Sequence, residues 1–210
     1  MFSLFNLSHI KYEKENPYIL IIGSIGFDKS ILIKNIMNII KAPANVAVSR
    51  LSTHYKIYYE FIDKKNIYNN YSSKLLNTIF ERQELLIKNN LDNRTILALD
   101  DCMSSRGDWI NNDDIKELFN NKDKHKIMLI LCMNFPLGIP LNYRETFDYI
   151  FLASEDFNNN KKRLYEHYGK YIFDTFEEFN KMFSIITGNY NNYMVLSIRD
   201  KKYYIYNKNF

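Results

Sequence analysis

The sequence has few of the residues that mark several classes of protein. It contains 2 cysteines among 210 residues, too few for a disulfide framework, and Cys102 and Cys132 lack the spacing of metal ligands. Its 4 histidines are scattered along the chain, which argues against a zinc site. No apolar run is as long as a membrane-spanning helix, and the first residues lack the basic region and cleavage signal of a secretory peptide. These absences predict a reducing, intracellular setting and no membrane span.

Basic residues are only slightly more numerous than acidic ones, and the formal net charge is +4. That excess is compatible with a polyanionic partner but is too small to argue for nucleic acid by itself. Hydrophobic residues make up 46% of the chain and charged residues 25%, as in ordinary soluble globular proteins. No internal repeat or low-complexity linker divides the chain. We therefore expect an N-terminal arm over residues 1–17 and a single domain over residues 18–210.

Eight residues with the character of a phosphate-binding loop follow the first apolar run. The run 18–22 predicts a strand, and apolar residues at helical spacing predict a helix over 30–41. A glycine-bearing loop that ends in Lys-Ser between a strand and a helix can bind phosphates through backbone N–H groups and the helix N-terminus. We expect Lys29 to neutralise the β- and γ-phosphate oxygens and Ser30 to bind Mg²⁺. The loop residues are Gly23, Ser24, Ile25, Gly26, Phe27, Asp28, Lys29 and Ser30.

One position departs from the phosphate-loop pattern G-x-x-x-x-G-K-[ST], which has glycine where this chain has Asp28. Two unit charges about 4 Å apart at an effective dielectric constant near 20 interact by roughly 4 kcal/mol. A carboxylate that faced the phosphates would therefore abolish useful affinity, whereas one that faced solvent would cost far less. The sequence leaves both orientations open.

Segments of strand character alternate with helices over the rest of the chain. Fully apolar runs such as 127–133 are typical of strands that are covered on both faces of a sheet. The alternation predicts a three-layer α/β fold with a mainly parallel central sheet. We expect strands at 46–48, 95–99, 127–133 and 147–152, a strand or edge segment at 55–62, helices at 73–88, 115–119, 158–168 and 175–187, and a closing hairpin of 193–198 with 202–206.

Polar side chains follow two of the apolar strands. Asp100 and Asp101 come directly after 95–99, and Asn134 follows 127–133. Parallel strands end at one edge of a sheet, and ligands of α/β folds bind there. We expect Asp100 to hold the Mg²⁺ shell through water and Asp101 to orient or deprotonate the attacking water. Asn134 would hydrogen-bond that water or the γ-phosphate.

Each of these features also has a simpler interpretation. A degenerate glycine loop can be a plain turn, an acidic pair after a strand can be a solvated strand end, and an asparagine before a proline-bearing loop can be a turn residue. Their order along the chain favours the phosphate-loop fold over three unrelated turns.

Two basic features have open interpretations. Arg144 precedes the segment 147–152 and is either an arginine finger for the nucleotide of a neighbouring subunit or a surface salt-bridge residue. The run Lys161, Lys162 and Arg163 either contacts a DNA backbone or forms a solvated helix face.

Several of these stretches together resemble one family, the DNA-packaging ATPases of poxviruses and other nucleocytoplasmic large DNA viruses, within the FtsK/HerA superfamily. The likeness runs from about residue 19 to residue 198. The stretches that carry it are 96–102 (ILALDDC), 115–119 (IKELF), 133–140 (MNFPLGIP), Arg144, 147–151 (FDYIF) and 163–168 (RLYEHY). The segments PLGIP and RLYEHY are the most specific of these.

The resemblance implies a RecA/FtsK/HerA-like P-loop ATPase that uses ATP and Mg²⁺ to move double-stranded viral DNA into a preformed capsid. It further implies a homo-oligomeric ring, expected to be a hexamer, that docks on capsid proteins, and a location in the host cytoplasm, at the viral factory, and in the virion. It supports the roles given above to the loop, to Asp100 and Asp101, and to Arg144 as a finger. The family usually has glutamine where this chain has Asn134.

Two other functions are left open. Asp28 motivates the first, a catalytically inactive P-loop relative that serves as a structural or DNA-binding subunit. The second is a nucleotide kinase with a similar loop, which is less favoured because the chain lacks an obvious basic lid.

Overall fold

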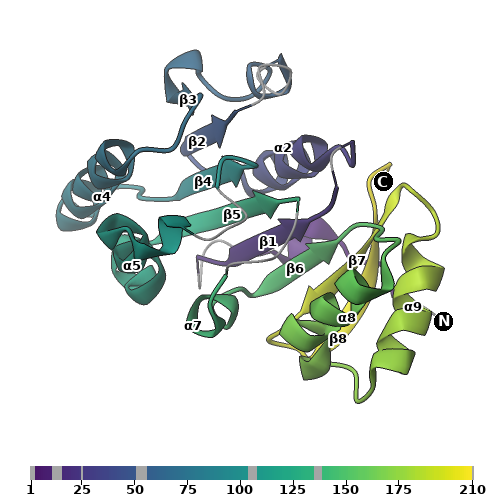
Figure 1. Ribbon diagram of the computed structural model, residues 1–210. Coiled ribbons are helices and arrows are strands. Elements are labelled where there is room, and N and C mark those ends of the chain that lie inside the picture. The colour runs from purple at the N-terminus through teal and green to yellow at the C-terminus, as the bar shows by residue number, and fades with distance from the viewer. Residues whose placement is uncertain are drawn as a thin grey trace.

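The computed structural model describes residues 3–10, 16–24, 26–50, 56–103, 108–134 and 139–209. Among these residues, eight strands form one sheet in the order β3-β2-β4-β5-β1-β6-β7-β8 (Figure 1). The strands are β1 (Tyr18–Ile22), β2 (Ala44–Ser49), β3 (Ile67–Tyr68), β4 (Thr95–Asp100), β5 (Ile127–Met133), β6 (Tyr149–Leu152), β7 (Asn192–Ser197) and β8 (Lys202–Asn207).

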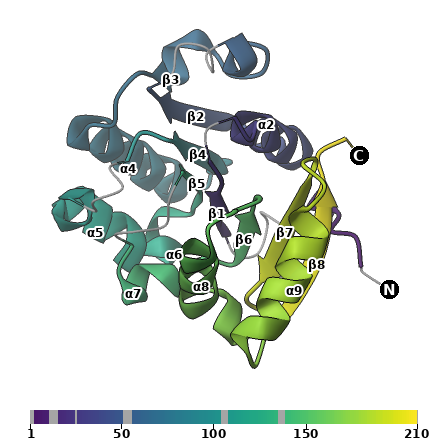
Figure 2. The ribbon, with the colours of Figure 1, turned by 45° about the vertical axis from the view of Figure 1, so that its right-hand side comes forward.

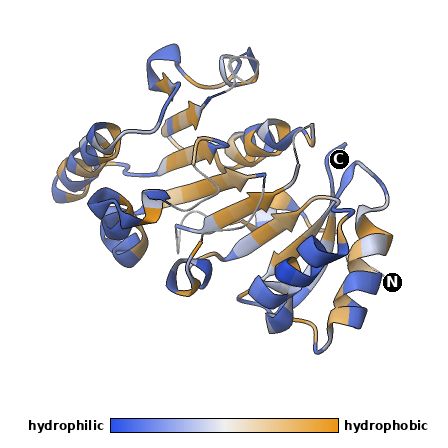
Figure 3. Ribbon diagram, in the orientation of Figure 1, coloured by the Kyte–Doolittle hydropathy of each residue, from blue (hydrophilic) through white to orange (hydrophobic). Residues whose placement is uncertain are grey.

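The sheet is mainly parallel, as the alternation of strands and helices predicts. All neighbouring pairs from β3 to β6 run parallel, and only β7 and β8 are antiparallel to their neighbours among the described strands. Every residue of β1 and of β5 is buried, and Figure 3 shows the central strands as the most hydrophobic part of the ribbon. Strands that are covered on both faces need apolar side chains on both, which explains the unbroken apolar runs.

Helices cover both faces of the sheet, so the predicted three-layer α/β architecture is confirmed. The helix α2 lies on one face, and α4, α5, α8 and α9 lie on the other (Figures 1 and 2). Successive residues of β1 alternate between the two cores, with Leu20 and Ile22 in one and Ile19 and Ile21 in the other. The helices are α2 (Lys29–Ile40), α4 (Ser73–Lys88), α5 (Asp113–Asn120), α6 (Lys122–His125), α7 (Leu141–Arg144), α8 (Asn158–His167) and α9 (Phe176–Thr187).

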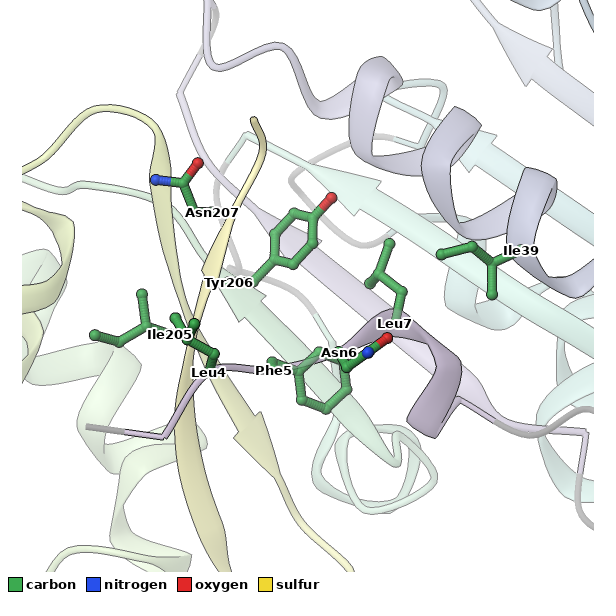
Figure 4. Close-up of a pocket in the computed structure, with 8 residues that line it drawn as sticks. All are labelled: Leu4, Phe5, Asn6, Leu7, Ile39, Ile205, Tyr206 and Asn207. Atoms are coloured by element: carbon green, nitrogen blue, oxygen red, sulfur yellow. The ribbon is translucent and has the colours of Figure 1, made fainter. Parts of the chain in front are cut away.

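Residues 3–10, which the sequence assigns to an N-terminal arm, lie along β8 and α2. The Phe5 N–H donates to the Ile205 carbonyl oxygen at 2.7 Å, and the 3₁₀ turn η1 (Leu7–His9) follows. Side chains of Phe5 and Leu7 are buried in the core on the α2 face. A pocket of about 220 Å³ lies between this segment, Ile39 of α2 and β8 (Figure 4). This pocket is separate from the loop between β1 and α2.

One predicted segment has a different structure. The alternating pattern of 55–62 predicts a strand or edge segment, but residues 56–58 form a helical turn and 59–62 continue as turns. The Ile62 N–H donates to the Tyr58 carbonyl oxygen at 2.8 Å, and both side chains are buried in the core on the α2 face. The strand prediction is therefore wrong for residues 56–62, because the aromatic pattern reflects packing onto the sheet rather than pairing within it. The remaining predicted strands and helices lie close to their predicted bounds.

No helix in the part of the chain that the structure describes combines the length and the apolar character needed to cross a membrane.

Candidate nucleotide-binding site

The predicted phosphate loop connects β1 to α2 at the carboxyl edge of the parallel strands (Figure 1). The Gly23 N–H donates to the carbonyl oxygen of Met133, the last residue of β5, at 3.2 Å. A Cβ atom on Gly23 would lie 2.7 Å from the Cβ of Ala153, so close packing excludes a side chain there. Gly26 has a φ of +96°, which L side chains rarely adopt. The two loop glycines are therefore required for different reasons, Gly23 by close packing and Gly26 by its backbone conformation. Ile25 lies outside the described residues.

Lys29 connects the loop to the ends of β4 and β5. Its side chain is buried, and Nζ donates to the carbonyl oxygens of Gly23 at 2.8 Å and of Ser24 at 3.3 Å. The same atom donates to Asn134 Oδ1 at 2.8 Å and lies 3.1 Å from Asp101 Oδ2. The structure thus brings together the loop lysine, the second acid and the amide that the sequence places after three separate strands.

The first acid pairs with the serine of the loop. Ser30 Oγ donates to Asp100 Oδ2 at 2.8 Å, and the Tyr58 hydroxyl donates to the same oxygen at 2.7 Å. Asp100 and Tyr58 are both 0% exposed. Burial, with the negative charge of Asp100 beside it, raises the pKa of Tyr58 well above its ordinary value, so the phenol stays a neutral donor at physiological pH.

The Ser30 hydroxyl and the Asp100 carboxylate suit a magnesium ion. Both supply the hard oxygen atoms that Mg²⁺ prefers, and this ion usually takes only one or two protein carboxylates, with water and phosphate completing its shell. Among the described residues, no group of three or more His, Cys, Asp or Glu side chains could hold a metal ion.

Tyr58 is a site residue that sequence reasoning missed. It lies 42 positions before Asp100, within the segment whose pattern predicted a strand. No motif marks it, because its role depends on how residues 56–62 pack beneath β4. The only sequence signal is a tyrosine among apolar residues, which is not specific in a chain with 17 tyrosines.

Replacement of Tyr58 by phenylalanine tests its role. Loss of a hydrogen bond to a buried carboxylate is expected to lower the free energy of unfolding by about 1–3 kcal/mol, measured by urea denaturation. Tyr68→Phe is the matched control, because it removes the same hydroxyl from an exposed residue of β3. Equal stability of the two variants would contradict the role assigned to Tyr58.

Asp28 has the backbone conformation that glycine normally supplies. Its φ and ψ are 39° and 36°, in the left-handed region, where aspartate is one of the better tolerated residues with a side chain. Its Oδ2 atom accepts a hydrogen bond from Lys208 Nζ at 2.9 Å. The carboxylate is therefore neither directed at Lys29 nor left unpaired, and the orientation that the sequence leaves open is decided by a residue just beyond β8.

Arg144 is not close to the other predicted site residues. It ends α7, which precedes β6, and the Asp148 N–H donates to the Tyr18 carbonyl oxygen at 2.8 Å at the start of β1. Arg144 thus lies toward the amino edge of the sheet, opposite the edge that carries Lys29. Lys162 and Arg163 of the basic run are exposed on α8.

The two cysteines take no part in the site chemistry. Both are free and buried. Burial raises the pKa of Cys102 to about 12 and that of Cys132 well above its ordinary value. Because only the thiolate is nucleophilic, both thiols are unreactive at neutral pH.

Solved structures with the same fold include viral genome-packaging enzymes. B204, the DNA-packaging ATPase from Sulfolobus Turreted Icosahedral Virus, superposes with a TM-score of 0.68 at 14% identity over 91% of this chain and 97% of that chain. The chain has the fold of a viral genome-packaging P-loop ATPase. B204 from Sulfolobus turreted icosahedral virus 2 in complex with AMPPCP gives a TM-score of 0.66 at 12% identity, over 90% of this chain and 96% of that chain. EssC (ATPases 2 and 3) from Geobacillus thermodenitrificans superposes with a TM-score of 0.60 at 13% identity over 92% of this chain and 40% of that chain.

Proteins similar in sequence also come from viruses. Uncharacterized protein L437 of Acanthamoeba polyphaga mimivirus is 29% identical over 163 residues, which is 73% of this chain and 57% of that protein. Uncharacterized protein 088R of Invertebrate iridescent virus 3 is 30% identical over 176 residues, 82% of this chain and 66% of that protein. The chain thus spans less than two thirds of the length of both relatives. No family model matches the chain.

Proposed function

We propose that the chain is a Mg²⁺-dependent ATPase that moves double-stranded DNA into a viral capsid. The observation that carries the proposal is the position of Lys29 Nζ, 2.8 Å from Asn134 Oδ1 and 3.1 Å from Asp101 Oδ2. A lysine at the start of a helix beside an acid and an amide can serve phosphoryl transfer to water. The fold supports the proposal, since structures that share it include genome-packaging NTPases in complex with AMPPCP and with ATP-gammaS.

Lys29 has a dual task in this proposal. Its ammonium group has three N–H donors and lies within 3.3 Å of four oxygen atoms of the loop, Asn134 and Asp101. To bind a phosphate oxygen, it must give up some of these acceptors. Release of Asp101 leaves a carboxylate beside the phosphate site that can accept the proton of the attacking water, and Asn134 can hydrogen-bond that water.

Ser30 and Asp100 are the residues that would hold Mg²⁺. When bound, the cation neutralises charge on the β- and γ-phosphate oxygens. The Tyr58 hydroxyl donates to Asp100 Oδ2 at 2.7 Å. This contact keeps Asp100 Oδ2 directed toward Ser30 even without the cation.

We assign Arg144 and the exposed basic residues of α8 to contacts with partner molecules. Arg144 lies toward the amino edge of the sheet, away from the nucleotide loop of its own chain. It would therefore act as an arginine finger on the nucleotide of a neighbouring copy. The copies would form a ring, which we expect to be a hexamer. Lys162 and Arg163 are exposed on α8 and are candidates for phosphate contacts with DNA. The ring would dock on capsid proteins at the viral factory in the host cytoplasm and remain with the virion.

Hydrolysis by the purified chain tests the proposal. We expect ATP hydrolysis that requires Mg²⁺, stops when the metal is removed with EDTA, and is faster with double-stranded DNA. Asp28→Gly is the matched variant, because it restores the usual loop residue. Hydrolysis by Asp28→Gly together with inactivity of the unmodified chain under the same conditions would refute the proposal.

The alternative function is an inactive relative that acts as a structural or DNA-binding subunit. Asp28 motivates it, although the contact with Lys208 gives the carboxylate a partner away from Lys29. Calorimetry with ATP and Mg²⁺ separates the two functions. Tight binding by the unmodified chain that is lost in Lys29→Ala would exclude the inactive subunit.

A further inference from the structure

Residues near the C-terminal strands brace the phosphate loop. The Tyr190 hydroxyl donates to the Gly26 carbonyl oxygen, and the rings of Tyr190 and Phe27 lie 4.4 Å apart. The buried Tyr193 of β7 donates its hydroxyl to the Phe27 carbonyl oxygen at 2.6 Å. Two loop carbonyl groups are thus held by tyrosines more than 160 positions away in sequence.

Lys208 also contacts the loop, through the carboxylate of Asp28. Its Nζ lies 2.9 Å from Asp28 Oδ2 and 4.5 Å from the centroid of the Tyr190 ring. The lysine N–H donates to the Asn191 carbonyl oxygen at 2.9 Å, which fixes the backbone beside the loop. The lysine side chain is 10% exposed and the aspartate side chain 47% exposed. The lysine side chain is therefore the more buried partner, and its ammonium group also contacts the Tyr190 ring.

The pairing addresses the one departure of the loop from its usual pattern. An unpaired carboxylate directly before Lys29 would repel a polyphosphate, because like charges at this range interact strongly where water is partly excluded. An ammonium group 2.9 Å from Asp28 Oδ2 cancels the net charge and keeps the carboxylate on the side of Tyr190.

We propose that Lys208 is a positioning residue that makes Asp28 compatible with nucleotide binding in this loop. The inference rests on the proposed function, because it assumes that the loop binds nucleotide phosphates. It extends that function by giving Lys208, a residue outside the phosphate-loop motif, the task of neutralising the Asp28 carboxylate. Loops of this kind with glycine at that position need no such neutralisation.

A double-mutant cycle with Lys208→Met and Asp28→Asn tests the inference. Asparagine tolerates the left-handed backbone and removes the charge. Binding of ATP-γ-S with Mg²⁺, measured by calorimetry on the full chain, should weaken at least tenfold in K208M. The same substitution in the D28N background should change the affinity less than about threefold, because no carboxylate is left to neutralise.

Lys202→Met is the matched control, because it removes one positive charge from an exposed position at the other end of β8. It should bind ATP-γ-S as the unmodified chain does, and a thermal melt should show that K208M is folded. Unchanged affinity of K208M, or an equal loss in both backgrounds, would overturn the inference while leaving the proposed function standing. Absence of binding by both the unmodified chain and D28N would refute the proposed function and the inference with it.

Discussion

Replacement of Asp101 by asparagine is expected to lower the rate of ATP hydrolysis about 10²–10⁴-fold, the usual contribution of a positioned general base. Asparagine keeps the shape and an oxygen acceptor for Lys29 but takes no proton from water at neutral pH. Nucleotide affinity should stay within about threefold or increase, because Lys29 loses the charged partner that competes with phosphate for its N–H groups. Single-turnover hydrolysis and calorimetry on the same preparation measure the two quantities separately.

Asp113→Asn provides the control for that experiment. It removes a carboxylate that is almost fully exposed on α5 and pairs with Lys116 at 2.9 Å, and such surface pairs contribute little to stability. Both its hydrolysis rate and its affinity should match those of the unmodified chain. If Asp101→Asn weakened binding as much as it slowed hydrolysis, Asp101 would be part of the binding site and not the base.

Lys29→Met is expected to weaken binding of ATP with Mg²⁺ at least about 100-fold. Hydrogen bonds to charged groups contribute about 1.5–3 kcal/mol each, and every 1.4 kcal/mol is about a tenfold change in affinity. The substitution also removes the ammonium group 3.1 Å from Asp101, in a pair whose side chains are 4% and 9% exposed. Loss of one partner of a buried pair lowers the free energy of unfolding by about 3–5 kcal/mol, which urea denaturation would measure.

The double variant Lys29→Met/Asp101→Asn separates these two effects. Neutralising Asp101 should recover most of the lost stability, because no buried carboxylate is then left without its ammonium group. Nucleotide binding should not recover. Lys34 lies on the same helix as Lys29 and forms a solvent-accessible ion pair with Glu60, so Lys34→Met should change neither quantity appreciably. Restored binding in the double variant would show that Lys29 matters only for stability.

Most elements of the fold could be predicted because their signals are local. The unbroken apolar run of β5 and the helical spacing in α4 are contained in consecutive residues, and the structure places both elements at the predicted bounds. Residues 56–62 were mispredicted because an aromatic residue that packs on a sheet face and one that lies in a strand can show the same alternation. The strand β3 was missed because 2 residues are too few for any periodicity.

The meeting of Lys29 with Asp101 and Asn134 could also be expected, because parallel strands end at one edge regardless of how their side chains pack. The contacts of Tyr58 with Asp100 and of Lys208 with Asp28 could not, since they join residues 42 and 180 positions apart. Nothing in either stretch indicates which distant group it will meet.

The sequence by itself therefore determined the fold class, the order of the polar strand ends and the loop that the fold presents. Tertiary structure alone decided that Tyr58 holds Asp100, that Arg144 lies toward the opposite edge, and that the carboxylate of Asp28 turns to Lys208. The physical reason is that periodicity and strand direction are properties of neighbouring residues. The partner of a buried or charged side chain, in contrast, depends on which distant segments the packed sheet brings within hydrogen-bonding distance.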